Sequence, residues 1–171
     1  ALVRKMPAVE TLGCTTVICS DKTGTLTKGE MTVRKIYLAG RMIEVSGAGY
    51  APDGDFRSGS VQVKAVGNRS LEEFLKHGLL CNDADLHERE GTWMIKGDPT
   101  EGALVVVAAK AGMRIRETRQ ENPRLEELPF SSERKRMTTI HRSGGARVAS
   151  VKGAPELVLE RCSRILADGV E

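Results

Sequence analysis

Hydrophobic and polar positions along this chain predict both strands and helices. Residues 15–19 (TTVIC) are β-branched and uncharged, which predicts a strand buried on both faces, as in a parallel sheet. Residues 32–38 and 41–45, separated by a short Ala-Gly turn, predict an antiparallel hairpin. Residues 46–60 are rich in Gly, Ser and Asp, which indicates an exposed loop.

Two helices are indicated by their starting residues. Residues 70–73 match a capping box, and apolar residues at helical spacing follow through about residue 80. Asp98 marks the second start, because Pro99 suits the first helical position and Glu101 completes a capping box.

The second half of the chain predicts a run of short elements. They are strands over 92–96, 128–131, 137–142 and 147–152, a solvated connection over 114–127, and a helix over 154–166 with Leu157, Cys162 and Leu166 inward. The order of elements predicts an α/β fold with α+β character. We expect an antiparallel sheet flanked by helices from about residue 31 onward, with the buried strand over 15–19 before it.

Composition excludes several classes of protein. With glycine included, the apolar share of the 171 residues falls in the globular range of about 45–50%, which argues against disorder. Net charge is only +3 and aromatic residues are 4%, which argues against a nucleic-acid partner. The longest uncharged apolar run, residues 103–109, is far short of the roughly 20 residues that span a membrane. The four cysteines form no C-x-x-C pair, and no secretory signal is visible, so we expect a cytosolic chain with reduced thiols.

The polar loop after the first predicted strand carries candidate chemistry. A carboxylate such as Asp21 at a strand end can attack phosphorus and form an acyl phosphate. Lys22 or a metal ion would offset the negative charge, and Gly24 permits a tight turn around phosphate oxygens. Thr23 and Thr25 add hydroxyl donors. The same residues also fit an ordinary turn between two strands, and these residue types alone leave both interpretations open.

Residues 19–27 (CSDKTGTLT) resemble the phosphorylation signature of P-type cation-transporting ATPases, and residues 21–27 match it without a departure. The resemblance implies that Asp21 accepts the γ-phosphoryl group of ATP and that Lys22 and Thr25 hold phosphate. It also implies that Asp21 and Thr23 bind Mg²⁺, the latter through its backbone carbonyl. Position 23 carries an acid–base Asp in related phosphatases, so Thr there favours a long-lived intermediate.

Three further segments resemble the nucleotide-binding domain of the same family, in the family's order. They are residues 96–104 (KGDPTEGAL), 128–137 (LPFSSERKRM) and 152–156 (KGAPE). The resemblance implies that Glu101 reaches the adenine amino group, that Phe130 stacks on adenine, and that Lys152 lies deep in the ATP pocket. It places Lys135 and Gly153 in the same pocket.

Each of these residues has a structural alternative. Glu101 also fits a purely capping role, Phe130 a place in the core, and Lys135 and Lys152 surface charges. Together, however, they offer an aromatic face, an acceptor for the amino group and cations for the phosphates. We therefore favour the nucleotide-binding interpretation.

The resemblance covers nearly the whole chain and is closest to the calcium-pump-like P2 branch. Residues 81–84 (CNDA) are a weaker match. One departure is Ser132, which stands where calcium pumps commonly carry an Arg that contacts phosphate. Arg134 and Arg136 are the candidates to replace that Arg.

The resemblance implies two bodies. Residues 1–30 would be part of a Rossmann-like, HAD-type phosphorylation domain, with its first strand, the Asp21 loop and a hinge. Residues 31–171 would be the nucleotide-binding domain, which in this family continues further, so we expect an incomplete pocket. The implied partners are ATP and the remaining phosphorylation, actuator and transmembrane domains.

The chain is therefore expected to be a cytoplasmic portion of an integral membrane protein, an ATP-driven cation pump. By itself it should bind ATP weakly and transport nothing. Two alternatives stay open. One is a nucleotide sensor in which Asp21 is never phosphorylated, and the other is a soluble HAD-type phosphatase, which predicts an acidic residue at position 23.

Overall fold

The computed structural model describes residues 13–17, 19 and 29–167. The chain divides into two units, residues 1–30 and 31–171. The described residues of the first unit are exposed and lie in no strand, so the buried strand predicted over 15–19 is wrong for its described residues. A strand buried on both faces needs hydrogen-bonded neighbours. The sheets that the structure describes do not include these residues.

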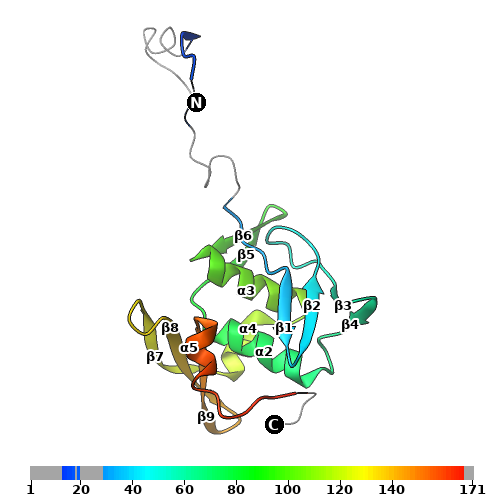
Figure 1. Ribbon diagram of the computed structural model, residues 1–171, viewed down its shortest axis with the longest axis vertical. Helices are drawn as coiled ribbons and strands as arrows, with labels where there is room; N and C mark the ends of the chain where they lie inside the picture. Colours follow the sequence, from blue (N-terminus) through cyan, green and yellow to red (C-terminus); the bar gives the residue numbers. More distant parts are fainter. Residues whose placement is uncertain (1–12, 18, 20–28, 168–171) are drawn as a thin grey trace. The chain divides into compact units, whose positions relative to one another are not determined.

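The second unit contains antiparallel sheets and helices (Figure 1), which confirms the predicted α/β class. The sheets are β1 (Lys35–Leu38), β2 (Arg41–Val45), β3 (Phe56–Ser58) and β4 (Val61–Val63) in that order; β5 (Asp85–Arg89) with β6 (Thr92–Lys96); and β7 (Arg124–Ser131), β8 (Arg136–Ser143) and β9 (Ala146–Gly153) in that order. The helices are α2 (Arg69–Leu80), α3 (Pro99–Lys110), α4 (Ile115–Glu121) and α5 (Pro155–Leu159). Within the described residues, none of these helices has the length and apolar character to cross a lipid bilayer.

Several short elements differ from the prediction. The expected loop over 46–60 contains β3, and the expected connection over 114–127 contains α4 and the start of β7. A strand of three residues such as β3 is too short for an alternation of apolar and polar residues to indicate it. Helix α4 has neither a side-chain cap nor a buried residue, so its sequence shows no apolar face. Helix α5 ends at Leu159 without burying a residue, so Cys162, predicted inward, is exposed.

The start of α2 also lies earlier than the pattern indicated. Asn68 caps this helix, because its side-chain oxygen accepts from the N–H of Leu71 at 3.1 Å. Glu72 accepts from the N–H of Gly67 at 3.0 Å, and Ser70, the predicted cap, is buried inside the helix. Asn and Ser cap equally well, so local preference did not distinguish the two positions.

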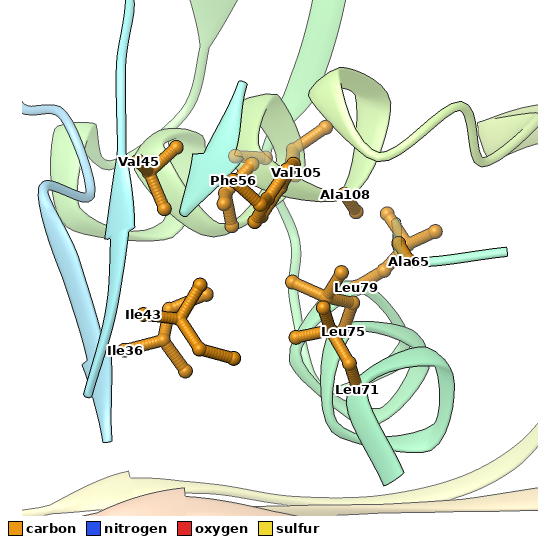
Figure 2. Packing of buried hydrophobic residues seen from close by; sticks show 12 residues of the cluster. Ile36, Ile43, Val45, Phe56, Ala65, Leu71, Leu75, Leu79, Val105 and Ala108 are labelled. Atoms are coloured by element: carbon orange, nitrogen blue, oxygen red, sulfur yellow. The ribbon is translucent and has the colours of Figure 1, made fainter. Parts of the chain in front are cut away.

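The main core lies between the first sheet and the two long helices (Figure 2). It includes Ile36, Ile43, Val45 and Phe56 from the sheet, Leu71, Leu75 and Leu79 from α2, and Val105 and Ala108 from α3. Valine disfavours helix, yet residues 105–107 of α3 are all buried. Burial therefore stabilises this helix.

One face of the third sheet packs against α2. The ring nitrogen Nδ1 of His77 lies 2.7 Å from Oγ of Ser150, and Cys81 Sγ contacts the carbonyl of Met137 at 3.6 Å. Ser150 and Lys152 lie two positions apart on β9, so their side chains share a face of the sheet. The contact of Ser150 with His77 therefore indicates that Lys152 also faces the helices.

Candidate functional site

Helix α3 begins beside the predicted nucleotide site because Asp98 caps it. The carboxylate oxygen Oδ1 of Asp98 accepts from the N–H groups of Thr100 at 2.8 Å and Glu101 at 3.2 Å. These contacts, that of Glu101 foremost, lower the pKa of Asp98. Pro99 occupies the first turn, so the predicted start of the helix is confirmed. The cap sets Glu101 in the first turn, where the helix dipole favours a carboxylate.

The Glu101 carboxylate joins two distant segments. Its Oε1 forms an ion pair with Nζ of Lys152, and its Oε2 accepts from the N–H of Asp83 at 3.0 Å. The two charged side chains are 18% and 25% exposed. Water and salt screen such a pair less than one on the open surface. Both oxygens of Glu101 thus bind groups outside its own helix, rather than serving only as a cap.

The loop after α2 holds this arrangement in place. Asn82 is 1% exposed, donates to the backbone oxygen of Glu101 at 2.8 Å and accepts from the N–H of Ala84 at 2.8 Å. Arg124 of β7 donates to the carbonyl of Asn82 at 2.7 Å and to the carboxylate of Asp83 at 2.6 Å. The predicted solvated connection included Arg124. Its role depends on partners more than 40 positions away, for which local sequence carries no signal.

Phe130 lies at the same end of the third sheet as Lys152. Ser131 and Gly153 both pair with Arg136, and they directly follow Phe130 and Lys152 along the chain. The Phe130 side chain is 62% exposed, so the core alternative for it is wrong. An exposed aromatic ring is available for stacking.

The turn between β7 and β8 approaches the end of β9 closely. The carbonyl of Lys135 accepts from the N–H of Ala154 at 3.0 Å. A Cβ added to Gly153 would lie 2.4 Å from that carbonyl oxygen and 2.6 Å from Cβ of Arg136. Glycine is therefore required at 153 for packing. Lys135 itself is exposed.

The cavities described in residues 29–167 lie elsewhere. One of about 480 Å³ is bordered by residues of α2 and α4 together with a loop before α2. A smaller one, about 240 Å³, is lined by Arg119, Arg124 and His141 among others. Glu101, Phe130 and Lys152 line none of them.

The predicted phosphorylation loop lies outside the described residues. This applies to Asp21, Lys22, Thr23 and Thr25, and so to the predicted Mg²⁺ ligands. Among the residues that the structure does describe, no three His, Cys, Asp or Glu side chains gather to hold a metal ion.

Comparison with known proteins gives a family. Residues 70–171 match the family model described as "P-type ATPase, cytoplasmic domain N". Among curated relatives, a cation-transporting ATPase of Synechocystis is 47% identical over 175 residues, which cover 98% of this chain and 19% of the relative. A calcium-transporting ATPase of Bacillus subtilis is 44% identical, covering 99% of this chain and 19% of the relative. A calcium-transporting ATPase type 2C member 1 of Bos taurus is 44% identical, covering 99% and 18%.

The chain thus spans about a fifth of the length of these relatives. The family match covers helix α3 and the third sheet, which carry Glu101, Phe130 and Lys152. This chain belongs to the family of the cytoplasmic N domain of P-type ATPases.

Proposed function

We propose that this chain is the nucleotide-binding and phospho-acceptor portion of an ATP-driven cation pump. The observation that carries the proposal is the ion pair between Glu101 and Lys152, which joins two motifs 51 residues apart. Phe130 stacks on adenine, Glu101 accepts from the adenine amino group, and Lys152 offsets the charge of the nucleotide. An ammonium group has three donors, so the bond to Glu101 leaves two for ATP.

Two further residues support nucleotide binding at this end of the sheet. Lys135 is exposed in the turn that follows Phe130 and supplies a second cation for phosphate groups. Gly153 lets the backbone of that turn approach β9. Phe130, Lys135 and Lys152 then lie on segments that are hydrogen-bonded to each other.

In the complete protein, Asp21 accepts the γ-phosphoryl group of the bound ATP. A carboxylate oxygen of Asp21 attacks the γ-phosphorus, the bond to the β–γ bridging oxygen breaks, and ADP leaves with its electron pair. Lys22 and Thr25 hold the phosphoryl oxygens. Mg²⁺ would be held by oxygen atoms of Asp21 and Thr23, the ligand type that this ion prefers, and would offset negative charge.

The names of the curated relatives support cation transport by the complete protein, with calcium among the candidate ions. We propose that the remaining phosphorylation, actuator and transmembrane domains are its partners, and that this portion works on the cytoplasmic side. The chain by itself binds ATP weakly and turns over none.

Phosphorylation of the complete protein tests this function. Incubation with γ-labelled ATP and Mg²⁺ should give a label that survives acid, is removed by hydroxylamine, and is lost in Asp21→Asn but retained in Asp53→Asn. ATP binding without any label would favour the nucleotide sensor. Labelling from a phosphate monoester but not from ATP would favour the soluble phosphatase.

A further inference from the structure

Arg134 uses its side chain to bind the backbone near Phe130. It lies in the turn between β7 and β8, and its Nη2 contacts the carbonyl oxygens of Leu128 at 3.1 Å, Pro129 at 2.6 Å and Arg136 at 3.2 Å. Two of these acceptors belong to β7 and the third to β8. The guanidinium group therefore links the two strands where the turn begins.

The contacted carbonyls lie at an irregular point of the sheet. β7 is an edge strand, its register shifts between Leu128 and Ser131, and Pro129 has no N–H to donate. The regular ladder is thus interrupted just where Phe130 sits. The carbonyl of Pro129 belongs to the peptide group that ends at the nitrogen of Phe130. A short charge-assisted hydrogen bond to that oxygen restrains the orientation of this peptide group.

The other side of Phe130 is held by the same turn. The backbone oxygen of Ser131 accepts from the N–H of Lys135 at 2.7 Å, and its hydroxyl oxygen accepts from the N–H of Arg134 at 3.2 Å. Phe130 thus lies between an anchored peptide group before it and the anchored residue Ser131 after it. Because Phe130 is 62% exposed, packing restrains its ring little, and the direction of its Cα–Cβ bond depends on these backbone anchors.

We infer that Arg134 is a positioning residue that presets the Phe130 ring for stacking on the adenine base, and that it does not contact the phosphates. This inference rests on the proposed function. It differs from the hypothesis that Arg134 compensates for Ser132 at the phosphate groups, because Nη2 of Arg134 donates to the carbonyls of the bulge. A ring that is already oriented loses less conformational freedom when the base binds.

Titrations with ATP and with adenosine separate the two roles, because adenosine carries no phosphate. We expect Arg134→Gln to weaken binding of both ligands by the same factor, roughly 3- to 10-fold, as the ring loses its preset orientation. Arg142→Gln, on the exposed end of β8, is the matched control and should leave both affinities unchanged. In a Phe130→Ala background, Arg134→Gln should cause no further loss.

Two results of these titrations would overturn the inference. A loss confined to ATP would identify Arg134 as a phosphate contact, and a loss that adds to that from Phe130→Ala would show that Arg134 does not act through the ring. Unchanged affinity for both ligands would remove it from the site altogether. If Arg134→Gln does not fold, Arg134→Lys replaces it in the same comparison, since lysine keeps a charged donor but lacks the planar fork.

A measurement without nucleotide keeps this inference separable from the proposed function. The chain has three Phe residues, so fluorine NMR of 4-fluorophenylalanine-labelled protein gives three signals, and Phe130→Leu identifies that of Phe130. Arg134→Gln should shift or broaden the Phe130 signal and leave that of buried Phe56 unchanged. If the unmodified chain binds neither ligand, the proposed function fails, whereas an altered Phe130 signal still supports the positioning role. An unaltered signal would overturn that role.

Discussion

Lys152 of β9 and Glu101 of α3 form an ion pair although 51 residues separate them in the sequence. The Glu101 carboxylate also accepts from the backbone of Asp83, so three segments meet at one side chain. Both charged side chains are mostly buried. Removing one partner leaves the other charge partly buried without its counter-ion, so the effects of the two substitutions should be coupled.

The first prediction concerns the cation of this pair. Lys152→Met should weaken ATP binding about 10- to 100-fold, because hydrogen bonds to charged groups contribute about 1.5–3 kcal/mol. Calorimetric titration measures the change. Lys76→Met, which removes the partner of Glu73 on α2, is the matched control and should leave ATP affinity unchanged. Equal losses in the two variants would contradict a specific role for Lys152.

Phe130→Ala should weaken binding of ATP and of adenosine alike, by about 1–3 kcal/mol, the scale of base–aromatic stacking. Phe74 of α2 is also exposed, at 45%, and Phe74→Ala provides the control for loss of an exposed ring. Unchanged affinity of the Phe130 variant in the titration would remove this ring from the site.

Asn82→Ala should lower the free energy of unfolding by about 1–3 kcal/mol, because it leaves the buried backbone groups of Glu101 and Ala84 without their partner. Urea denaturation with an unchanged m-value measures this loss. Gln120→Ala, on the exposed side of α4, should change stability by less than about 0.5 kcal/mol. A variant as stable as the parent would show that Asn82 does not support the position of Glu101.

Substitution by alanine should destabilise the fold at one glycine and stabilise it at another. Gly153→Ala places a methyl group against the carbonyl of Lys135 and should destabilise the fold by about 1–3 kcal/mol. Gly78, inside α2, has open space around its Cα, and Gly78→Ala should stabilise by roughly 0.5–1 kcal/mol. Thermal unfolding of both variants compares them directly. Stabilisation by Gly153→Ala would refute the close approach of the turn to β9.

Stability should fall as the pH is lowered below neutrality, because of His77. Burial lowers the pKa of His77 below its usual value, with Glu73 opposing part of the shift. The unfolded chain therefore binds this proton more readily, so the stability contribution is complete above the unfolded pKa of about 6.5 and is lost as pH falls towards the folded pKa. Denaturation midpoints measured from pH 8 to pH 5 give the dependence of stability on pH. The substitution His77→Gln should weaken this dependence, whereas His87→Gln, at an exposed position on β5, should leave it unchanged.

Elements with strong local chemistry were predictable from sequence. The cap at Asp98 followed by Pro99 identified the start of α3, and the Ala39-Gly40 turn identified the hairpin of β1 and β2. Short or weakly patterned elements were not. β3 buries Phe56 from a three-residue strand, and α4 has no buried residue, so neither displays a period.

For the candidate site, sequence identified Glu101, Phe130 and Lys152 as separate residues through the family motifs that contain them. It gave no role to Asn82 or Arg124, whose hydrogen-bond partners lie up to 44 positions away. It named Arg134 and Arg136 as candidates to contact phosphate, and it gave no sign that Nη2 of Arg134 donates to backbone carbonyls beside Phe130. Residue type alone does not reveal which acceptor an arginine will meet.

Sequence by itself determined the family of this protein, the start of α3 at Asp98 and the hairpin of β1 and β2, because caps, turns and motifs act over a few neighbouring residues. Tertiary structure alone decided that Glu101 meets Lys152, that Gly153 must lack a side chain, and that Phe130 stays exposed. Those outcomes depend on how the third sheet and the helices pack together. Contacts between residues distant in sequence exist only once that packing has formed.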